Sequence, residues 1–589
     1  MIYTPPVRDM LFLVDEWISL DNIRKLPGHE DLDREMLEAI LEEAGKFGVN
    51  ELLPLNLEGD EVGAVLVDGE VRTPPGFRKA YERFVEAGWT GIDADPAHGG
   101  QGLPKLVQYL IDEMLAACNL SFMLYPDLTH GAYHLINAFA SDELRERYLP
   151  KMAEGVWSGT MCLTEPHSGT DLGLLTTKAV PRGDGAYDIT GSKIFITSGD
   201  HDLTENIIHM VLARIEDAPE GVRGISLFLV PKSIVNDDGS VGERNNVLTG
   251  SLEHKMGIRA SATCALNFDG ATGFLVGAEN RGLNAMFRMM NMERIAVGIQ
   301  GLGIAEIAYQ NALVYARERL QSRAPGKRPD ENRAADPIIY QPDIQRKLLR
   351  IRSQVEGARA LAVYSGHLVD VFDKTVDDDH RVQAAGLIAL LTPMVKSFLS
   401  DLGVESALAA QQVFGGHGYV TEHGMEQLVR DARIAQIYEG TNEVQAVDLV
   451  TRKLTADKGG VVEGQFEYWG GFFERNDDPA EILKPASAAL EQLKTATRWI
   501  RDSLESDPAR ALGAATEYQR LFGLTIIGCI WADIVVSIAG KDGEFYGRKR
   551  KLARFYMEHV LPEAASLTEV ITGGSDALAE FSVEDFVGN

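Results

Sequence analysis

A carboxylate placed directly before glycine is the first feature of this sequence that could carry out chemistry. Residues 432–445 read ARIAQIYEGTNEVQ, with Glu439 next to Gly440. Glycine allows a ligand to approach the backbone closely, so Glu439 could act as a general base toward a bound substrate. The competing interpretation is a solvated turn, in which Gly440 ends one element and Thr441 caps the next helix. Other motifs have to decide between a base and a turn.

A second candidate is the segment MCLTEPHSGTDLG (161–173), which concentrates hydroxyl side chains, glycine and proline in one predicted loop. Such a loop can offer several backbone N–H groups and hydroxyls to the edge of one polar ring. The alternative is a well-capped connector between a helical and a β region.

Further candidates are cationic or rich in glycine. Lys255, Arg259 and Arg294 (in NMERIAVG) could hold phosphates, or could form ordinary surface ion pairs. Arg319 lies in YARERLQSR near the end of a helical pattern, where a cation complements the helix dipole. The glycines of QQVFGGHGYVTE (411–422) allow close approach to a ligand, or they form a helix C-cap.

Several chemistries are disfavoured by what the sequence lacks. GLGIAE (301–306) superficially resembles a dinucleotide-binding fingerprint, but it lies in a helical pattern, follows no strand and lacks the final glycine. There is no Walker motif, no HExxH and no spaced Cys/His set, so a metal enzyme is not expected.

Charge and cysteine usage limit the partners and the compartment. The chain has 57 Lys and Arg against 87 Asp and Glu, a formal charge of −30, which disfavours nucleic acid and anionic membranes. The four scattered cysteines are expected to be buried, reduced thiols. The N-terminus shows no cationic leader, and the apolar run 524–540 carries Asp533 and falls short of about 20 residues, so it is read as a core helix rather than a membrane span. A cytoplasmic protein is predicted.

The elements that would position these residues follow from the hydrophobic periodicity. Apolar spacing of three and four predicts helices within 1–155, with breaks at LPLNLEGD and DADPAHGGQGLP. A period of two predicts short antiparallel strands, as a barrel or sandwich, within 156–283. Long amphipathic patterns over 284–455 predict a helical bundle, and 456–589 reads as an added helical domain. The expected class is α+β with four domains.

Seven motifs in this order make the chain similar to the acyl-CoA dehydrogenase family over the region that ends at about residue 455: CLTEPHSGTD, GSKIFITSGD, HKMGIRAS, NMERIAVG, ARERLQSR, VFGGHGYVTE and RDARIAQIYEGTNEVQ. The resemblance implies the order helical domain, β domain, four-helix bundle. It also implies an FAD cofactor held by the β domain and the bundle, with its adenosine end reaching a neighbouring subunit, and hence a homodimer or tetramer.

The resemblance also assigns roles residue by residue. Glu439 matches the catalytic base, and Tyr438 and Gly440 flank the thioester. Members can instead carry the glutamate on the long helix after the β domain, but the intact YEGT favours Glu439. Arg294 matches a residue that meets the acyl-CoA, and Thr170 one that is shared by flavin and substrate. The matched flavin positions are Met161, Leu163, Thr164, Thr170, Phe195, Thr197, Arg319, Gln321, Gln412, Gly416, Thr441 and Glu443. Phe195 stands where many relatives have Trp, and Glu443 where they often have Gln.

The implied reaction is α,β-dehydrogenation of an acyl-CoA. Glu439 would take the α-proton, its N–H and a flavin ribityl hydroxyl would bind the thioester oxygen, and the β-hydride would pass to the flavin. The opening YTPPVRDMLFLVDE and the added C-terminal domain are most similar to larger bacterial members that oxidise 3-(methylthio)propanoyl-CoA to 3-(methylthio)acryloyl-CoA in dimethylsulfoniopropionate demethylation, with an electron-transfer flavoprotein as acceptor. The alternatives are a short- or medium-chain dehydrogenase of β-oxidation, an acyl-CoA oxidase, or a helical interaction protein without catalysis.

Overall fold

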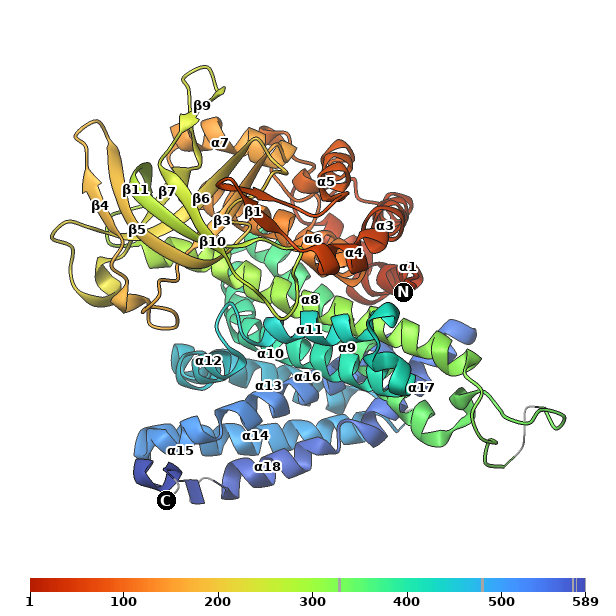
Figure 1. The fold of residues 1–589 in the computed structure, drawn as a ribbon. Coiled ribbons are helices and arrows are strands. Elements are labelled where there is room, and N and C mark those ends of the chain that lie inside the picture. Colours follow the sequence, from red (N-terminus) through yellow and green to blue (C-terminus); the bar gives the residue numbers. More distant parts are fainter. Residues whose placement is uncertain (327–329, 478–480, 575–576, 579, 588–589) are drawn as a thin grey trace. The chain divides into compact units, whose positions relative to one another are not determined.

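The computed structural model describes residues 1–326, 330–477, 481–574, 577–578 and 580–587 (Figure 1). The contacts within the chain divide it into two units. The β unit comprises Glu43–Pro104 and Met114–Ala296, and the helical unit comprises Met1–Glu42, Lys105–Glu113 and Val297–Asn589. The division into four domains at 155, 283 and 455 stays a prediction.

The helical segments expected before residue 155 are present as helices. They are α1 (Val7–Leu11), α2 (Leu20–Arg24), α3 (Arg34–Phe47), α4 (Asn56–Val62), α5 (Phe77–Glu86), α6 (Lys105–Phe139) and α7 (Asp142–Glu154), with a π-helical segment at Phe12–Ser19 and a hairpin of β1 (Val65–Val67) and β2 (Glu70–Arg72). The predicted break at LPLNLEGD is wrong, because α4 occupies it. Gly59 in α4 is there for packing, since a Cβ would lie 2.9 Å from the Phe77 ring.

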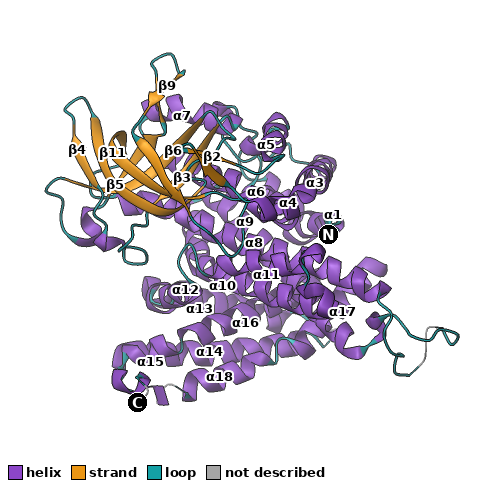
Figure 2. Ribbon diagram, in the orientation of Figure 1, coloured by secondary structure: helices purple, strands orange, loops and turns teal. Residues whose placement is uncertain are grey.

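The β region forms one seven-stranded, barrel-like sheet, as predicted, but it contains parallel as well as antiparallel pairs (Figure 2). Its strands are β3 (Trp157–Cys162), β4 (Lys178–Pro181), β5 (Ala186–Thr197), β6 (Asn206–Ile215), β7 (Ser226–Pro231), β10 (Val247–Leu252) and β11 (Thr263–Val276), and β8 (Ser233–Val235) pairs separately with β9 (Val241–Arg244). β7 pairs with both β6 and β11, which closes a barrel-like ring with β4 and β5. The expected antiparallel pairing holds except that β3 and β4 each run parallel to β6.

The core of the β unit lies between this sheet and the helices beside it. Tyr148 of α7 packs on Trp157 of β3 with ring centroids 5.9 Å apart, and Ile208 and Leu229 of the sheet belong to the same buried cluster. Met289 of α8 (Gly282–Glu318) also joins it. The strand β3, which carries the polar loop 163–171 at its end, is therefore fixed by packing on both sides.

The helical unit is built on α8, α9 (Pro342–Lys374) and α10 (Asp378–Phe414), followed by α11 (Met425–Arg433) and α12 (Asn442–Asp448). Close approach of α8 and α10 depends on small residues. A Cβ on Gly298 would lie 2.7 Å from the Val395 carbonyl oxygen, and one on Gly301 would lie 2.3 Å from that of Leu399. Gly301 of GLGIAE therefore serves helix packing, and the segment lies inside α8, as its helical pattern predicted.

The added C-terminal region is helical as predicted, with α13 (Gly460–Arg475), α14 (Leu483–Ser506), α15 (Pro508–Gly513), α16 (Ala515–Ser537), α17 (Glu544–His559) and α18 (Glu563–Gly573). At 23 residues α16 is longer than the apolar run 524–540, and by length it could cross a membrane. In the apolar windows of α16 and of 378–419, however, 78% and 67% of residues are buried within the protein, as in core helices. All four cysteines are buried and free, as predicted.

A buried ionic cluster joins distant parts of the helical unit. Arg359 of α9 has a fully buried side chain and forms ion pairs with Asp9 at 2.6 Å, Glu113 at 2.5 Å and Glu306 at 2.6 Å. Lys549 of α17 also contacts Asp9. The C-terminal helices are thus connected through charged groups to the start of the chain.

Candidate active site

The segment around Glu439 is a strained turn between two short helices. A 3-10 turn (Ile434–Gln436) follows α11, and α12 begins at Asn442. Glu439 has φ = +57° and Gly440 has φ = +84°, so two successive residues adopt the left-handed conformation. A non-glycine residue in this region costs free energy and persists only where surrounding contacts hold it. The contacts around Glu439 must therefore hold its backbone in this conformation.

Specific hydrogen bonds hold this turn. The Gln445 side chain is fully buried and donates to the Glu439 carbonyl oxygen at 3.0 Å. It also fills the space beside Gly440, where a Cβ would lie 2.7 Å from Gln445 Nε2. Thr441 caps α12 by accepting from the Val444 N–H at 3.3 Å, which confirms the predicted cap. The capped turn and the positioned carboxylate therefore exist together and are not alternatives.

The residue before the glutamate is anchored to the bundle. The Tyr438 hydroxyl donates to the side-chain oxygen of Gln300, which is buried on α8. Glu439 is half-buried, and it lies between the anchored Tyr438 and the start of α12. The arrangement can present a carboxylate at a fixed position, as a general base requires.

A buried polar network beneath the turn was missed by sequence reasoning. Asn442 donates to Asp401 at 2.7 Å and accepts from Lys396 at 2.8 Å, while Gln436 donates to Asp401 at 2.6 Å. Burial raises the pKa of Asp401, although the bonds from Gln436 and Asn442 oppose this effect. Because both ends of the turn bond to the same Asp401, the network fixes its width. The only sequence signal was the polar residues within the apolar pattern of α10.

In the β unit, the loop after β3 is organised around Glu165, another residue that the sequence did not single out. Its carboxylate, 3% exposed, accepts from the backbone N–H and hydroxyl of both Thr176 and Thr177 at 2.6–3.0 Å. It also pairs at 2.8 Å with Lys193 of β5, a lysine with no exposed side-chain surface. Lys193 further donates to the Leu163 carbonyl oxygen at 3.0 Å. The loop is thereby fastened to β5 from inside.

The Glu165 contacts predict a pH-dependent stability. Burial by itself would raise the pKa of Glu165, but Lys193 and the threonines lower it from 4.5 to about 2. The charged contact therefore stabilises the fold fully above pH 4.5 and is lost as the pH falls toward 2. The shift corresponds to about 3 kcal/mol, so Glu165→Gln should lower the free energy of unfolding by about that amount at pH 7 and by much less at pH 3.

Urea denaturation followed by circular dichroism at the two pH values measures this difference. The matched control is Glu143→Gln on α7, whose side chain is 76% exposed and should show little change at either pH. An equal loss for Glu165→Gln at pH 7 and pH 3 would contradict the role of its charge.

Phe195 lies on a β-bulge of β5. The pairing with β11 shifts between Cys264 and Leu266, and Phe195 at this shift has φ = +58°. Bulges redirect side chains, and here Phe195 is 59% exposed although Ile196, the next residue, is buried. An aromatic face held open in this way suits the flat ring of a flavin.

Two other predicted flavin positions of the β unit, Thr164 and Thr197, lie close to Phe195 along β5. The Thr164 carbonyl oxygen accepts from the Ile194 N–H at 2.9 Å. This bond brings the loop alongside β5, one residue before Phe195. Thr197 pairs with Thr263 at the end of β5. Met161 and Thr164 are partly exposed, Thr170 is exposed, and Leu163 is 8% exposed. Arg294, 8% exposed, donates to Asn291 at 3.4 Å on α8.

In the helical unit, the predicted pyrophosphate and adenosine positions gather on one exposed surface. Tyr315 of α8 stacks on Phe414 with ring centroids 4.2 Å apart and bonds to His417 at 2.8 Å, which joins the end of α8 to the loop after α10. Arg319, one turn beyond Tyr315, is exposed, as are Gln321, Gln412 and Gly416. In this glycine-rich loop Gly415 and Gly416 are exposed, and a Cβ at either would meet no atom within 4 Å, so a ligand could approach both. Gly415 is needed for its φ of +59°, and Gly418 lies against α10, where a Cβ would be 2.4 Å from the Gln411 carbonyl oxygen.

The remaining predicted position, Glu443, is exposed in the first turn of α12. Its own backbone N–H and Thr441 lower its pKa, so it is an anion and cannot donate as the glutamine of relatives could. In the β unit, the exposed aromatic ring on the bulge and the hydroxyl-lined loop have the chemistry to hold a flavin ring. In the helical unit, the exposed Arg319 and Gly416 have the chemistry to hold a phosphate group.

Comparison with protein families finds four matches that together follow most of the chain. Residues 34–156, 160–271 and 280–454 match the N-terminal, middle and C-terminal domains of acyl-CoA dehydrogenases, and residues 465–582 match a domain described as acetyl-CoA dehydrogenase C-terminal like.

Three individual proteins illustrate the likeness. The chain is 40% identical to 3-methylmercaptopropionyl-CoA dehydrogenase of Ruegeria pomeroyi, over 99% of this chain and 100% of that protein. It is 33% identical to a butyryl-CoA dehydrogenase of Syntrophomonas wolfei, over 97% of each. The fold is that of a Bacillus anthracis acyl-CoA dehydrogenase solved with FAD, with a TM-score of 0.74 and 23% identity over 97% of this chain and 93% of that one.

Proposed function

The chain belongs to the acyl-CoA dehydrogenase family of FAD-dependent oxidoreductases that act on the CH–CH group of acyl-CoA, and from this premise we propose its substrate and the roles of its residues. The proposed reaction converts 3-(methylthio)propanoyl-CoA to 3-(methylthio)acryloyl-CoA, a step of dimethylsulfoniopropionate demethylation. The observation that carries the proposal is the 40% identity to a 3-methylmercaptopropionyl-CoA dehydrogenase along its whole length, the C-terminal helices included.

Glu439 is the proposed base. Its carboxylate removes the α-proton of the thioester, and its backbone N–H donates to the thioester oxygen as negative charge develops there. The left-handed turn and the hydrogen bond from Gln445 to the Glu439 carbonyl oxygen support this role, because they hold the backbone of the turn. Tyr438 and Gly440 flank the thioester, and Arg294 and Thr170 contact the acyl-CoA. Bound FAD supplies the acceptor for the hydride that leaves the β-carbon.

The chain's own residues hold that cofactor in the proposal. Phe195 and Thr197 cover one face of the ring, and the loop residues Met161, Leu163, Thr164 and Thr170 line its polar edge. Arg319, Gln321, Gln412 and Gly416 bind the pyrophosphate and adenosine of a partner subunit's FAD, and Thr441 and Glu443 make the last contacts. The exposure of Arg319, Gln412 and Gly416 and of the nearby Tyr419, 84% exposed, supports a homodimer in which this surface is covered.

A thioether substrate and a short alkyl substrate are close in shape and polarity. Sulfur replaces a methylene of similar size, and an apolar pocket distinguishes such groups by only about 1 to 3 kcal/mol. A 33% identical butyryl-CoA dehydrogenase that also covers the whole chain makes a short fatty acyl-CoA dehydrogenase the second candidate.

Anaerobic stopped-flow mixing of the yellow holoenzyme with 3-(methylthio)propanoyl-CoA and with butanoyl-CoA tests the substrate. The proposal expects flavin bleaching with both, about tenfold more efficient for the thioether, in line with the lower end of that discrimination. Equal or faster bleaching with butanoyl-CoA would replace the proposed substrate by a short alkyl chain.

Reoxidation in air and FAD content distinguish the proposed dehydrogenase from an oxidase and from a protein without catalysis. We propose a cytoplasmic enzyme that passes electrons to an electron-transfer flavoprotein, so the reduced enzyme should reoxidise slowly in air. Rapid reoxidation with stoichiometric peroxide would instead indicate an acyl-CoA oxidase. A purified protein without FAD would point to an interaction protein that has kept only the fold.

A further inference from the structure

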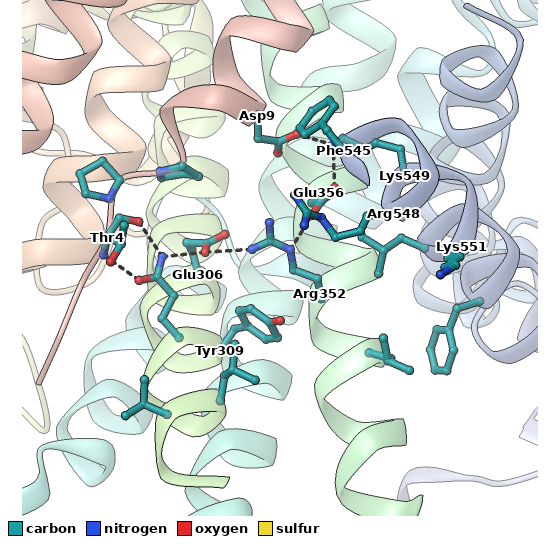
Figure 3. A pocket seen from close by; sticks show the side chains of 18 of the residues that line it. Thr4, Asp9, Glu306, Tyr309, Arg352, Glu356, Phe545, Arg548, Lys549 and Lys551 are labelled. Carbon is teal, nitrogen blue, oxygen red and sulfur yellow. Dashed lines mark hydrogen bonds and ion pairs between the residues drawn. The ribbon is translucent and has the colours of Figure 1, made fainter. Parts of the chain in front are cut away.

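The helical unit contains a large cavity that shares no residue with the proposed active site. Its volume is about 840 Å³ (Figure 3). It lies between the N-terminal segment, α8, α9 and α17, and its apolar lining includes Ile2, Pro5, Leu313, Val314, Leu349 and Phe555. A volume of this size is typical of sites for small organic ligands, which occupy about 300 to 1,000 Å³.

The cavity is preformed, because hydrogen bonds hold its walls. The N-terminal segment is fixed to α8 by the Thr4 N–H, which donates to Gln310 at 2.7 Å, and by the Ile2 N–H, which donates to Asn311 at 2.9 Å. Gln310 in turn donates to the Thr4 carbonyl oxygen at 2.9 Å. A ligand would meet this wall without first having to order it.

The charges of the inner wall are already paired. Figure 3 shows a row of ion pairs along it, in which Arg352 lies between Glu306 at 3.3 Å and Glu356 at 2.5 Å. Lys549 continues the row from Glu356, at 2.6 Å, to Asp9. Because each of these groups has an oppositely charged partner, the inner wall offers no free charge to a ligand.

The outer rim is different, because α17 places cations there that are free or only weakly paired. Lys551 is exposed and has no ion pair or hydrogen bond within the described part of the chain. Arg548, three residues earlier and so on the same face of the helix, pairs only with Glu544, at 2.6 Å, and both side chains are at least 60% exposed. Such exposed pairs contribute little and are easily exchanged for another anion. In a chain of charge −30 this rim is a local exception.

We propose that this cavity binds an amphipathic carboxylate, with its aliphatic chain against Leu313, Val314 and Leu349 and its head group at Lys551 and Arg548. The apolar floor selects a chain of medium length, and the cationic rim selects a negative head. A short acid would leave most of the cavity unfilled, and a cationic amphiphile would be repelled at the rim. The site would be a second ligand site, independent of the thioester bound near Glu439.

Isothermal titration of the FAD-containing protein with dodecanoate, dodecylamine and butanoate tests the proposal. Dodecanoate should bind one per chain without changing the flavin absorption bands, and the other two should bind at least about tenfold more weakly. Lys551→Glu should weaken dodecanoate binding about tenfold, and Val314→Trp, which places a bulky ring where the aliphatic chain would lie, should weaken it at least as much. Lys79→Ala, an exposed lysine of α5 outside the cavity, is the matched control and should bind as the parent protein does.

Because Lys551 is exposed, Lys551→Glu tests the site even where the tryptophan variant fails to fold. Three results would overturn the proposal. These are no dodecanoate binding, equal binding of dodecylamine and dodecanoate, and dodecanoate binding that perturbs the flavin and is unaffected by Lys551→Glu, which would place the ligand at the flavin site.

Discussion

Replacing Glu439 by glutamine is expected to lower kcat by about three orders of magnitude or more while leaving FAD content unchanged. Glutamine keeps the size of the side chain and the backbone contact with Gln445, but it cannot accept the α-proton. The measurement is the rate of anaerobic flavin reduction in a single turnover, with the flavin absorbance of the purified variant as a check on cofactor binding.

The matched control for this variant is Glu293→Gln. Some relatives carry the base on the long helix that follows the β domain, and α8 places Glu293, 4% exposed, directly before Arg294. Glu293→Gln should retain flavin reduction well above the rate of Glu439→Gln. The reverse order of the two rates would move the base to α8.

Replacing Arg359 by leucine should have the largest effect on stability, lowering the free energy of unfolding by about 5 kcal/mol. The substitution leaves Asp9, Glu113 and Glu306 buried without their common partner, and breaking even a single buried pair costs about 3 to 5 kcal/mol. Urea denaturation at pH 7.5 measures the loss. The control is Arg554→Leu, because the Arg554 side chain is 67% exposed and its partner Glu558 lies one turn further along α17, so this pair should contribute little.

The stability lost in Arg359→Leu should depend on pH, because the buried acids Asp9, Glu113 and Glu306 remain in the variant. Burial already raises the pKa of Glu113, while Lys549 and Arg359 hold that of Asp9 at about 2. Without Arg359 the buried acids should take up protons more readily, and protonation relieves the uncompensated charge. The difference between parent and variant should therefore shrink from pH 8 to pH 5. A double substitution with Glu113→Gln should recover part of the loss, and the absence of recovery would argue against charge as its cause.

The sequence predicted the elements whose periodicity is local. α5 and α7 follow from spacing of three and four, and β5, β6, β7 and β11 follow from alternation. The parallel pairing of β3 with β6 could not be predicted, because alternation defines which side a residue faces and says nothing of the neighbouring strand. The helix α4 was missed because LPLNLEGD, with its proline and glycine, was interpreted as a break, although Gly59 lies within the helix and makes room for Phe77.

At the candidate site, the sequence motifs located the residues that would face ligands, while the residues that hold them stayed hidden. Glu439, Thr441 and Phe195 lie in recognisable motifs. Lys193 and Glu165 lie in such motifs too, but their pairing joins positions that are 28 residues apart, and no spacing rule predicts it. The bond between Asp401 and Gln436 likewise depends on tertiary packing. Supporting contacts of this kind require coordinates.

The contact between Asp9 and Lys549 has a consequence for how the protein is made. The two residues are 540 positions apart, so at about 5 to 20 residues per second the ribosome adds Lys549 roughly 30 to 110 s after Asp9. The apolar residues Met10–Val14 are all buried in the folded protein. During this time they lack the neighbours that α17 provides. The β unit, which ends at Ala296, can fold much earlier. Phe12, whose ring packs on Phe545 at 5.4 Å between centroids, therefore cannot complete its packing until the last helices have been made.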